Sequence, residues 1–399
     1  MRTASSLSAR ARGKLLRELT PYLDGYSLYF NLPPAGGRTE RLAEYARVGS
    51  RSEVSGRILV PSPGHVELGN EVRLGSLRVD SGSYLFVDHG VQDAGVICRD
   101  RHCIKTRLKE YTGSYSGENQ VTISVDFEAG VALSHATPET WPYLRNFWDS
   151  RSCVLRLAEL FKKYRIPATW ATCGHLFLDG CSGDHGFDER DWQGEWFSHD
   201  PCSDYETAPS WYMPDVIEEL IKTPHFEIGY HTFGHFRLRH CSEATVRRDM
   251  ELARQIRKKW GLKLESFVFP YNECGHFELL KEGGFTNFRG NIGKILPSYG
   301  IIDFGDFRFF NTTQMFAPET MDRCFRLLDG LDGRAANFYT HCYQWGERDA
   351  WQKLEQWLAR LAGLRDAGKI SLAKMGDLRP ARPVESKPAV TVGEPCWNR

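Results

Sequence analysis

The chain has 399 residues, which is enough for one large domain with additions or for two domains. Lysine plus arginine and aspartate plus glutamate both total 51, so no net charge favours nucleic acid or an anionic membrane as a partner. No stretch approaches the roughly 20 consecutive apolar residues of a transmembrane helix, and we therefore expect no membrane span. The composition is that of an ordinary globular protein.

The N-terminal stretch MRTASSLSARARGKLLREL is basic, but no apolar segment follows it, so we expect no secretory signal. The eleven cysteines include no C-x-x-C pair, and Cys98 and Cys103 lie closest together. Several other cysteines lie within apolar segments, where a reduced thiol behaves as a small hydrophobe. These features predict a reducing environment and a cytoplasmic location.

Residues 1–115 differ in pattern from the rest of the chain. After a helical opening at residues 15–23, the stretch 50–107 consists of short alternating runs that are separated by Gly, Pro and Asp. This pattern predicts a small β-rich module, which YTGSYSGENQ (residues 111–120) links to the next domain. Nothing in the module points to chemistry.

Residues 116–378 alternate between apolar strands and amphipathic helices. We expect strands at 121–125, 168–174, 225–231, 264–270, 285–291, 336–342 and 370–375. Helices are expected between them at 152–164, 213–222, 243–261, 276–284, 318–331 and 351–368. This alternation requires parallel strands with helical crossovers, and the lack of a Gly-rich phosphate loop favours a closed or nearly closed barrel. The Pro-rich residues 379–399 are expected to be disordered.

Polar residues follow several of these strands, at the end where barrels gather their functional groups. Two imidazoles and one carboxylate form a common ligand set for a hydrolytic divalent metal, and a second carboxylate can act as the base. The candidate residues at the strand ends are Asp126, Glu128, His231, His235, Pro270, Tyr271, Asn272 and His341.

The motifs SVDFE, HTFGH, FVFPYNE and THC, in that order, resemble those of the polysaccharide deacetylase family, which shares the chitooligosaccharide deacetylase homology domain. The resemblance covers roughly residues 121–375. It implies a distorted (β/α)7-type barrel and a bound divalent metal, usually Zn²⁺. Members of this family remove N-acetyl or, more rarely, O-acetyl groups from amino sugars, and relatives cleave other non-peptide C–N bonds.

The resemblance assigns roles to the second motif, H-[ST]-x-x-H. His231 and His235 match its two metal-binding histidines. Thr232 matches the hydroxyl position that steadies the loop in the family.

The first motif departs from the family pattern T-F-D-D, in which the first Asp is the base and the second binds the metal. Asp126 matches the base, whereas Phe127 occupies the position of the ligand and Glu128 follows it. Because one branch of the family has D-x-D or D-x-E, we expect Asp126 to be the base and Glu128 the third ligand. The reverse assignment remains open, since strand alternation keeps both residues on one face.

The third motif, R-x-P-Y in the family, is also incomplete. Pro270 and Tyr271 match, and the resemblance makes the Tyr271 backbone N–H an oxyanion donor. Val268 occupies the position of the Arg that pairs with the base, so the sequence leaves no partner for Asp126.

His341 corresponds to the late-strand histidine that acts as general acid on the leaving amine, although it can equally be a barrel histidine that bonds to backbone. Asp303 or Asp306 is a candidate for the carboxylate that orients it.

Residues 188–212 are dense in aromatic and acidic residues and form either a substrate lid that stacks on sugar rings or a loop that packs upon itself. Three histidines border this loop: His175, His185 and His199. The candidate substrate-binding residues are Trp196, Trp211, Tyr212, Asn272 and Glu273.

These features predict a metal-dependent hydrolase that removes an N-acetyl group from an amino sugar or a sugar-containing intracellular metabolite. The expected partner is a small-molecule or glycan substrate. One alternative is hydrolysis of a cyclic imide or ureide, for which a missing Arg is expected. Another is a carbohydrate-binding relative that has lost turnover through Phe127 and Val268.

Overall fold

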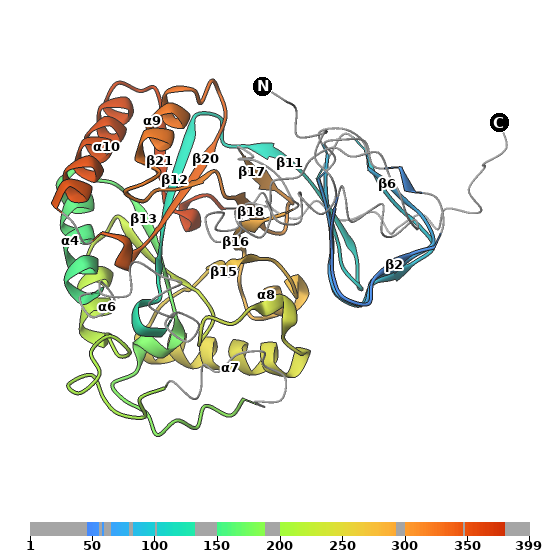
Figure 1. Cartoon of the computed structure of the whole chain (residues 1–399), viewed down its shortest axis with the longest axis horizontal. Helices are drawn as coiled ribbons and strands as arrows, with labels where there is room; N and C mark the ends of the chain where they lie inside the picture. Colours follow the sequence, from blue (N-terminus) through green and yellow to red (C-terminus); the bar gives the residue numbers. More distant parts are fainter. Residues whose placement is uncertain are drawn as a thin grey trace, which may run out of the picture.

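The computed structural model describes residues 46–379, apart from 56–57, 60–64, 80–82, 100–101, 132–149, 188–199, 293–299 and 346–347. The helix expected at residues 15–23 and the Pro-rich tail lie outside the described residues. Figure 1 shows a helix-covered body on one side and a narrower β module on the other.

The N-terminal module is a parallel coil of short strands with three faces. Paired residues on the first face, such as Val66 and Leu85, lie one turn of the coil apart in the chain. The side chains that point inward, among them Val66, Leu85 and Cys103, are fully buried and form a separate core. The three faces are β1 (Ala46–Val48), β4 (His65–Leu68), β7 (Tyr84–Val87) and β10 (His102–Lys105); β2 (Glu53–Val54), β5 (Arg73–Leu74) and β8 (Gln92–Asp93); and β3 (Ile58–Leu59), β6 (Leu77–Val79) and β9 (Val96–Cys98).

The second part of the chain contains a parallel sheet, as the strand–helix alternation predicts. In spatial order its strands are β18 (Arg308–Asn311), β16 (Asn287–Asn291), β15 (Ser266–Glu273), β14 (Phe226–Tyr230), β13 (Ala168–Thr172), β12 (Gln120–Phe127), β20 (Ala336–His341) and β19 (Gln314–Met315). Three further strands complete the sheet. The short strand β21 (Ser371–Ala373) pairs with the start of β12, and the antiparallel strands β11 (Glu110–Ser116) and β17 (Ile301–Asp303) connect the sheet to the module.

The two ends of this parallel sheet meet at one segment of the chain. Strand β18 pairs with β16 at one end, and β19, which follows β18 almost at once, pairs with β20 at the other. Between them, Thr312 N donates to Gly290 O at 3.2 Å and Thr313 N donates to Asn337 O at 2.8 Å. The fold is therefore α/β with a distorted barrel, as expected. The distortion lies between β18 and β19, where a regular barrel would have one continuous strand.

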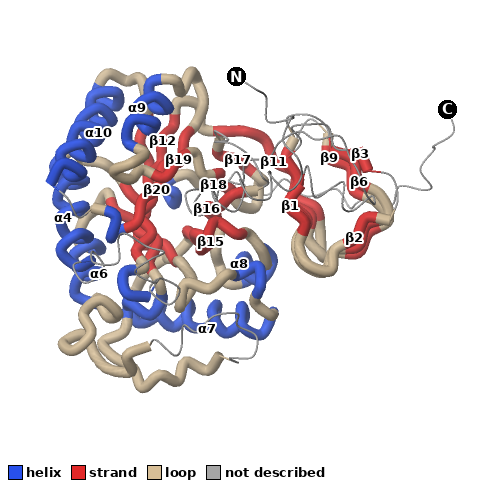
Figure 2. Tube along the Cα trace, in the orientation of Figure 1, coloured by secondary structure: helices blue, strands red, loops and turns tan. Residues whose placement is uncertain are grey.

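Helices cover the outside of the barrel, and the strands lie within (Figure 2). They are α4 (Ser150–Lys163), α6 (Pro214–Ile221), α7 (Glu243–Trp260), α8 (Phe277–Glu282), α9 (Met321–Asp329) and α10 (Arg348–Asp366). Short 3₁₀ turns lie at η4 (Gly174–Phe177), η6 (Leu238–His240), η7 (Cys342–Gln344) and η8 (Met375–Asp377). Local sequence sets the ends of α7: the Ser242 hydroxyl accepts from Thr245 N, and Gly261 ends the helix at φ 64°.

Buried polar contacts join the module to the barrel. Glu67 lies 2.5 Å from the Arg239 guanidinium, and the two side chains are 0% and 5% exposed. The Asp88 carboxylate accepts from the backbone N–H groups of His276 and Phe277, each at 2.9 Å, where α8 begins. Asp88 of the module thus caps the N-terminus of α8, whose own N-cap residue, His276, makes no side-chain cap hydrogen bond.

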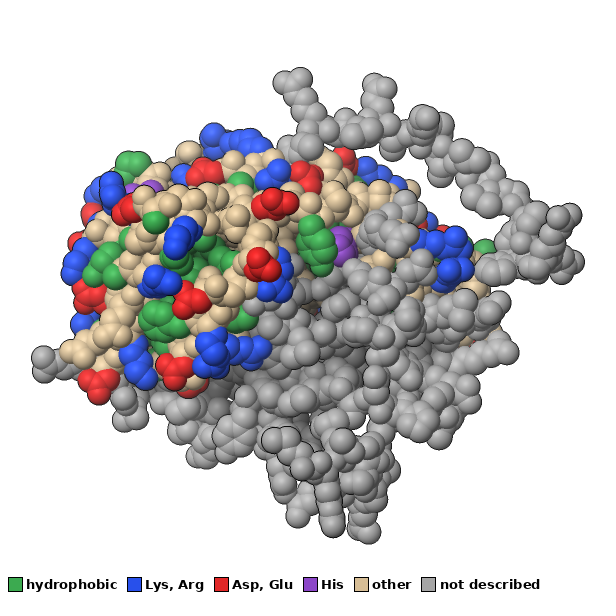
Figure 3. All heavy atoms as spheres, turned by 90° about the horizontal axis from the view of Figure 1, so that it is seen from above, with side chains coloured by type: hydrophobic (Ala, Val, Ile, Leu, Met, Phe, Trp, Pro, Cys, Tyr) green, Lys and Arg blue, Asp and Glu red, His purple; other side chains and the backbone are tan. Residues whose placement is uncertain are grey.

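The surface carries no uniform charge on the face that Figure 3 shows, where lysine and arginine side chains are interspersed with aspartate and glutamate over its described part. Among the described residues, no helix combines the length and the apolar character needed to span a membrane.

We predict that Arg239→Met lowers the free energy of unfolding by about 3 kcal/mol, because it leaves Glu67 buried without its cation. Urea denaturation measures this loss. Arg51→Met, which removes the exposed pair with Glu71, is the matched control and has little effect. Equal effects of the two variants would contradict the importance assigned to the buried pair.

Candidate functional site

Three of the predicted residues meet at the carboxyl ends of β12 and β14. The Oε2 atom of Glu128 lies 2.6 Å from His235 Nε2 and 3.6 Å from His231 Nε2. One carboxylate oxygen and two ring nitrogens lie within 4.8 Å of one another, and all three residues are buried. One carboxylate and two imidazoles form the donor set of a catalytic zinc site that leaves further positions open. The residues present therefore fit a divalent metal.

The backbone between the two histidines is fixed by local hydrogen bonds. His231 Nδ1 lies 2.8 Å from the Val268 carbonyl oxygen on β15, so its Nε2 is the nitrogen that faces Glu128. The Thr232 hydroxyl accepts from Phe236 N at 2.9 Å, which is the steadying role that the resemblance implies. Thr232 and His235 have φ values of 58° and 59°, which are unusual for non-glycine residues and typical of functional turns.

Asp249 on α7 supports the same turn, and no sequence motif marks it. Its Oδ1 accepts from Phe233 N at 2.7 Å and from the Tyr230 hydroxyl at 3.0 Å. Complete burial raises the pKa of Asp249 to about 7, although these two donors act in the opposite direction.

Asp126 has a partner that the motifs do not predict. Arg289 on β16 places its Nη2 2.7 Å from Asp126 Oδ2 and its Nη1 2.9 Å from the Ser124 hydroxyl. Arg289 is 1% exposed and lies with its guanidinium 4.4 Å from the Tyr339 ring centre. The arginine missing at Val268 is therefore replaced from a neighbouring strand. The sequence signal that could have identified it is a charged residue inside the predicted strand FTNFRGN, because a buried Arg requires a carboxylate.

His341 lies close to both carboxylates, Asp126 and Glu128. Its Nε2 lies 3.6 Å from Glu128 Oε1 and 3.8 Å from Asp126 Oδ2, and the side chain is 20% exposed. Asp126 and His341 are direct neighbours in the register of β12 and β20. The prediction that Asp303 or Asp306 orients this histidine is wrong.

Asp303 and Asp306 instead form ion pairs with cationic side chains on nearby elements. Asp303 pairs with Arg308 at 3.1 Å, and Asp306 pairs with Lys109 at 2.5 Å and with Lys281 at 3.0 Å.

The charge of Glu128 is stabilised by its neighbours. Burial alone would raise the pKa of Glu128, but His235, His341 and His231 together hold it well below its usual value. The Tyr343 hydroxyl also donates to Glu128 Oε1 at 2.7 Å. Burial lowers the pKa of His235 despite the nearby carboxylate, which favours the neutral imidazole that a metal requires.

The residues after the Pro-Tyr turn lie beside this group. The Tyr271 ring centre is 4.7 Å from that of His235, and Arg237 lies 4.4 Å from it on another side. Tyr271 and Asn272 have φ values of 57° and 55°. The Asn272 amide donates to the Tyr339 hydroxyl at 3.4 Å, whereas Glu273 lies 3.7 Å from Arg237.

Two of the three aromatic candidates lie among the described residues. Tyr212 is completely buried and does not present its ring to solvent, and its hydroxyl lies 3.2 Å from Cys181 Sγ. Trp211 is 7% exposed, and its carbonyl lies 3.0 Å from His175 Nδ1. Both therefore pack the loop down. Trp196 lies outside the described residues.

Residues 123–276 match the family model described as polysaccharide deacetylase. Over these residues the chain is similar to the polysaccharide deacetylase family. The match includes Asp126, Glu128, His231, His235 and Tyr271, and it ends before Arg289 and His341. No curated protein matches the chain.

Several solved structures are similar to this chain. A Mycobacterium smegmatis protein named as a polysaccharide deacetylase is 15% identical, with 66% of this chain and 89% of that chain covered at a TM-score of 0.45. Puue allantoinase is 13% identical, with 65% of this chain and 88% of that chain covered at a TM-score of 0.42. A family 4 carbohydrate esterase from Streptomyces lividans, in complex with acetate, is 10% identical. The match covers 68% of this chain and 100% of that chain at a TM-score of 0.37.

We predict that Arg289→Met lowers the free energy of unfolding of the barrel by about 3–5 kcal/mol, because it leaves the Asp126 carboxylate buried without its cation. Urea denaturation measures the loss. Adding Asp126→Asn to this variant restores part of the stability, since the unpaired charge is removed. A double variant that is less stable than both single variants would contradict this account.

We also predict a pH dependence that arises from Asp249. Because its pKa is about 7 in the folded state and about 4 when unfolded, its contribution to stability falls as pH rises from about 4 to 7. Asp249→Asn removes this effect, so the variant gains about 2–3 kcal/mol relative to wild type between pH 5 and pH 8. Urea denaturation with a chelator present measures the difference without a contribution from metal. The exposed α9 residue Asp322 provides the control Asp322→Asn, and a parallel response of the two variants would contradict the prediction.

Proposed function

We propose that the deacetylase domain is a metal-dependent hydrolase that removes an N-acetyl group from an amino sugar or a sugar-containing metabolite. The observation that carries the proposal is the buried pair of Asp126 and Arg289 beside the Glu128, His231 and His235 group. A base, a metal-ligand set and an acid are thus close together, and the family match supports hydrolysis of an acetylated carbohydrate.

Glu128, His231 and His235 are the proposed metal ligands. They would hold a divalent ion, which we propose is Zn²⁺ and which would supply the Lewis acidity that makes water nucleophilic near neutral pH. Glu128 suits this role better than Asp126, because its Oε2 is the carboxylate oxygen that faces both histidines.

Asp126 is the proposed general base. Arg289 occupies its Oδ2, and its buried Oδ1 has no hydrogen-bond partner among the described residues. That oxygen is therefore available to accept a proton from the attacking water. The Arg289 guanidinium holds the carboxylate in a fixed orientation throughout the reaction.

His341 is the proposed general acid. Its ring is partly exposed and lies near both carboxylates, so a substrate can reach it from solvent. Its role is to protonate the nitrogen as the C–N bond breaks, because an amine is a poor leaving group without a proton. The Tyr271 backbone N–H is the proposed donor to the oxyanion, a contact that is typically worth about 3–4 kcal/mol.

Arg289 also weakens the two alternative functions. The argument for a cyclic imide or ureide rested on an absent arginine, and a non-catalytic role rested on two broken motifs. Arg289 supplies the cation that Val268 lacks, and Glu128 supplies the carboxylate that Phe127 lacks. The departures from the family motifs thus have local replacements that preserve the chemistry.

We predict that Asp126→Asn lowers kcat for acetate release at least ~10²-fold while the metal content stays unchanged. Glu128→Gln lowers metal content and activity together, because it removes a ligand. Acetate released from N-acetylglucosamine, its oligomers and nucleotide-linked N-acetylhexosamines is the activity readout, and elemental analysis gives the metal content.

Asp303→Asn is the control for these variants and retains activity, because Asp303 pairs with Arg308 away from the site. Loss of metal in Asp126→Asn but not in Glu128→Gln would reverse the two roles. Absence of acetate release from every acetylated sugar in the presence of bound metal would overturn the proposed substrate class.

A further inference from the structure

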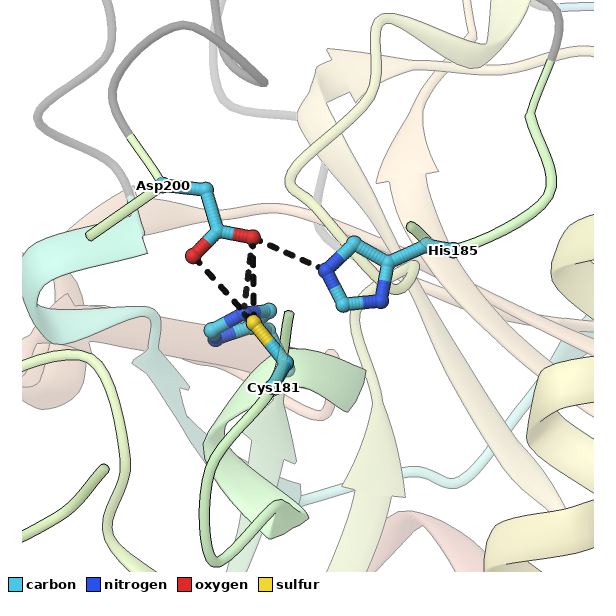
Figure 4. A group of neighbouring side chains, drawn as sticks. Cys181, His185 and Asp200 are labelled. Carbon is cyan, nitrogen blue, oxygen red and sulfur yellow. Dashed lines mark hydrogen bonds and ion pairs between the residues drawn. The ribbon is translucent and has the colours of Figure 1, made fainter. Parts of the chain in front are cut away.

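A second group of potential ligands lies outside the proposed active site, in the loop between β13 and α6. We refer to it as the loop cluster, and its members are His175, Cys181, His185 and Asp200. His175 is part of η4, directly after β13, and the other three follow it along the chain. Figure 4 shows the Cys181 sulfur and the His185 ring converging on the Asp200 carboxylate.

The members of the loop cluster are chemically suited to zinc. Two imidazoles, one thiol and one carboxylate are all zinc ligands, and four protein ligands form the closed set typical of structural rather than catalytic sites. His175 and Asp200 are completely buried at their side chains, and the His185 side chain is 6% exposed. A cysteine also distinguishes this cluster from the Glu128, His231 and His235 group, which has none.

The separations between these atoms are close to the edges of a zinc tetrahedron. Zn–N and Zn–O bonds of about 2.0 Å and a Zn–S bond of about 2.3 Å place neighbouring ligand atoms about 3.3–3.6 Å apart. Asp200 Oδ2 lies 3.5 Å from His175 Nε2, 3.3 Å from Cys181 Sγ and 2.9 Å from His185 Nε2. The His175 Nε2 to Cys181 Sγ distance is 3.6 Å.

A second layer of contacts orients the loop cluster. His175 Nδ1 lies 3.0 Å from the Trp211 carbonyl oxygen, so its Nε2 faces the cluster, as is usual for a metal-ligating histidine. The Tyr212 hydroxyl donates to Asp200 Oδ1 at 3.3 Å, and Cys202 N donates to the same oxygen at 3.0 Å. These contacts occupy Oδ1, whereas Oδ2 is the oxygen that faces both imidazoles.

We propose that the loop cluster binds a structural Zn²⁺ ion, separate from the metal of the active site. The ion ties the start of the loop, at the end of β13, to Asp200, which comes after residues 188–199. It adds crosslinks in a loop that has little regular structure of its own among the described residues. Trp211 and Tyr212 then serve as packing around a metal site.

The loop cluster also supports the turn that carries the active-site histidines. The Phe233 ring, within the HTFGH motif, lies 4.8 Å from the His185 ring and 5.6 Å from the His175 ring. His175 N donates to Phe233 O at 3.0 Å, and Arg248 on α7 donates to His185 O at 2.8 Å. A metal in the loop cluster therefore braces one side of this turn, while Asp249 braces another.

The test uses the full chain loaded with Co²⁺, which reports thiolate ligation through a charge-transfer absorption band in the near ultraviolet. We expect wild type to bind about two metal ions per chain and to show this band. Cys181→Ser binds about one ion and loses the band. His231→Ala also binds about one ion but keeps the band, because the Glu128, His231 and His235 group contains no thiol.

Cys202→Ser is the matched control, because Cys202 lies in the same loop and is exposed, yet its thiol is outside the cluster. This variant keeps both the band and the second metal ion. A chelator lowers the melting temperature of His231→Ala by several degrees, whereas Cys181→Ser has already lost that stabilisation.

Two results would overturn the second site, namely a Co²⁺-loaded wild type without the charge-transfer band, or a band that persists in Cys181→Ser. Either result leaves the proposed hydrolase intact, because its metal is measured separately by the loss of one ion in His231→Ala.

Discussion

The Glu128 carboxylate, buried at the end of β12, is the feature on which the proposed active site depends. Removing a carboxylate from water carries a large free-energy cost unless cations or hydrogen bonds compensate. His231, His235 and His341 surround Glu128, and the Tyr343 hydroxyl donates to it. This single charge thus holds together residues from three strands that are distant in sequence, and it does so where a divalent cation would be bound.

The neighbouring Asp126 shows how the site tolerates changes in its motifs. A buried carboxylate needs a cation, but that cation does not have to come from one particular position in the chain. Arg289 reaches Asp126 from β16, whereas the family pattern places an arginine at Val268 on β15. Because adjacent parallel strands present side chains to the same end of the sheet, an arginine on either strand can pair with the same carboxylate.

The turn between His231 and His235 is supported from outside by groups that take no part in the chemistry. Asp249 holds its backbone from α7, and the loop cluster packs against Phe233. Precise placement of metal ligands requires such a supporting layer, since the ligands alone do not fix their own orientation. The β module adds support nearby, through the buried contact between Glu67 and Arg239.

The sequence by itself determined the alternation of strands and helices and placed Glu128, His231 and His235 at strand ends, because local periodicity and short motifs record these features. It did not reveal Arg289 as the partner of Asp126, or that Tyr212 is completely buried. It also did not reveal the parallel coil of the module or the interruption of the barrel between β18 and β19. These depend on which strands become neighbours, and such neighbours are chosen by packing between residues far apart in the chain rather than by local pattern.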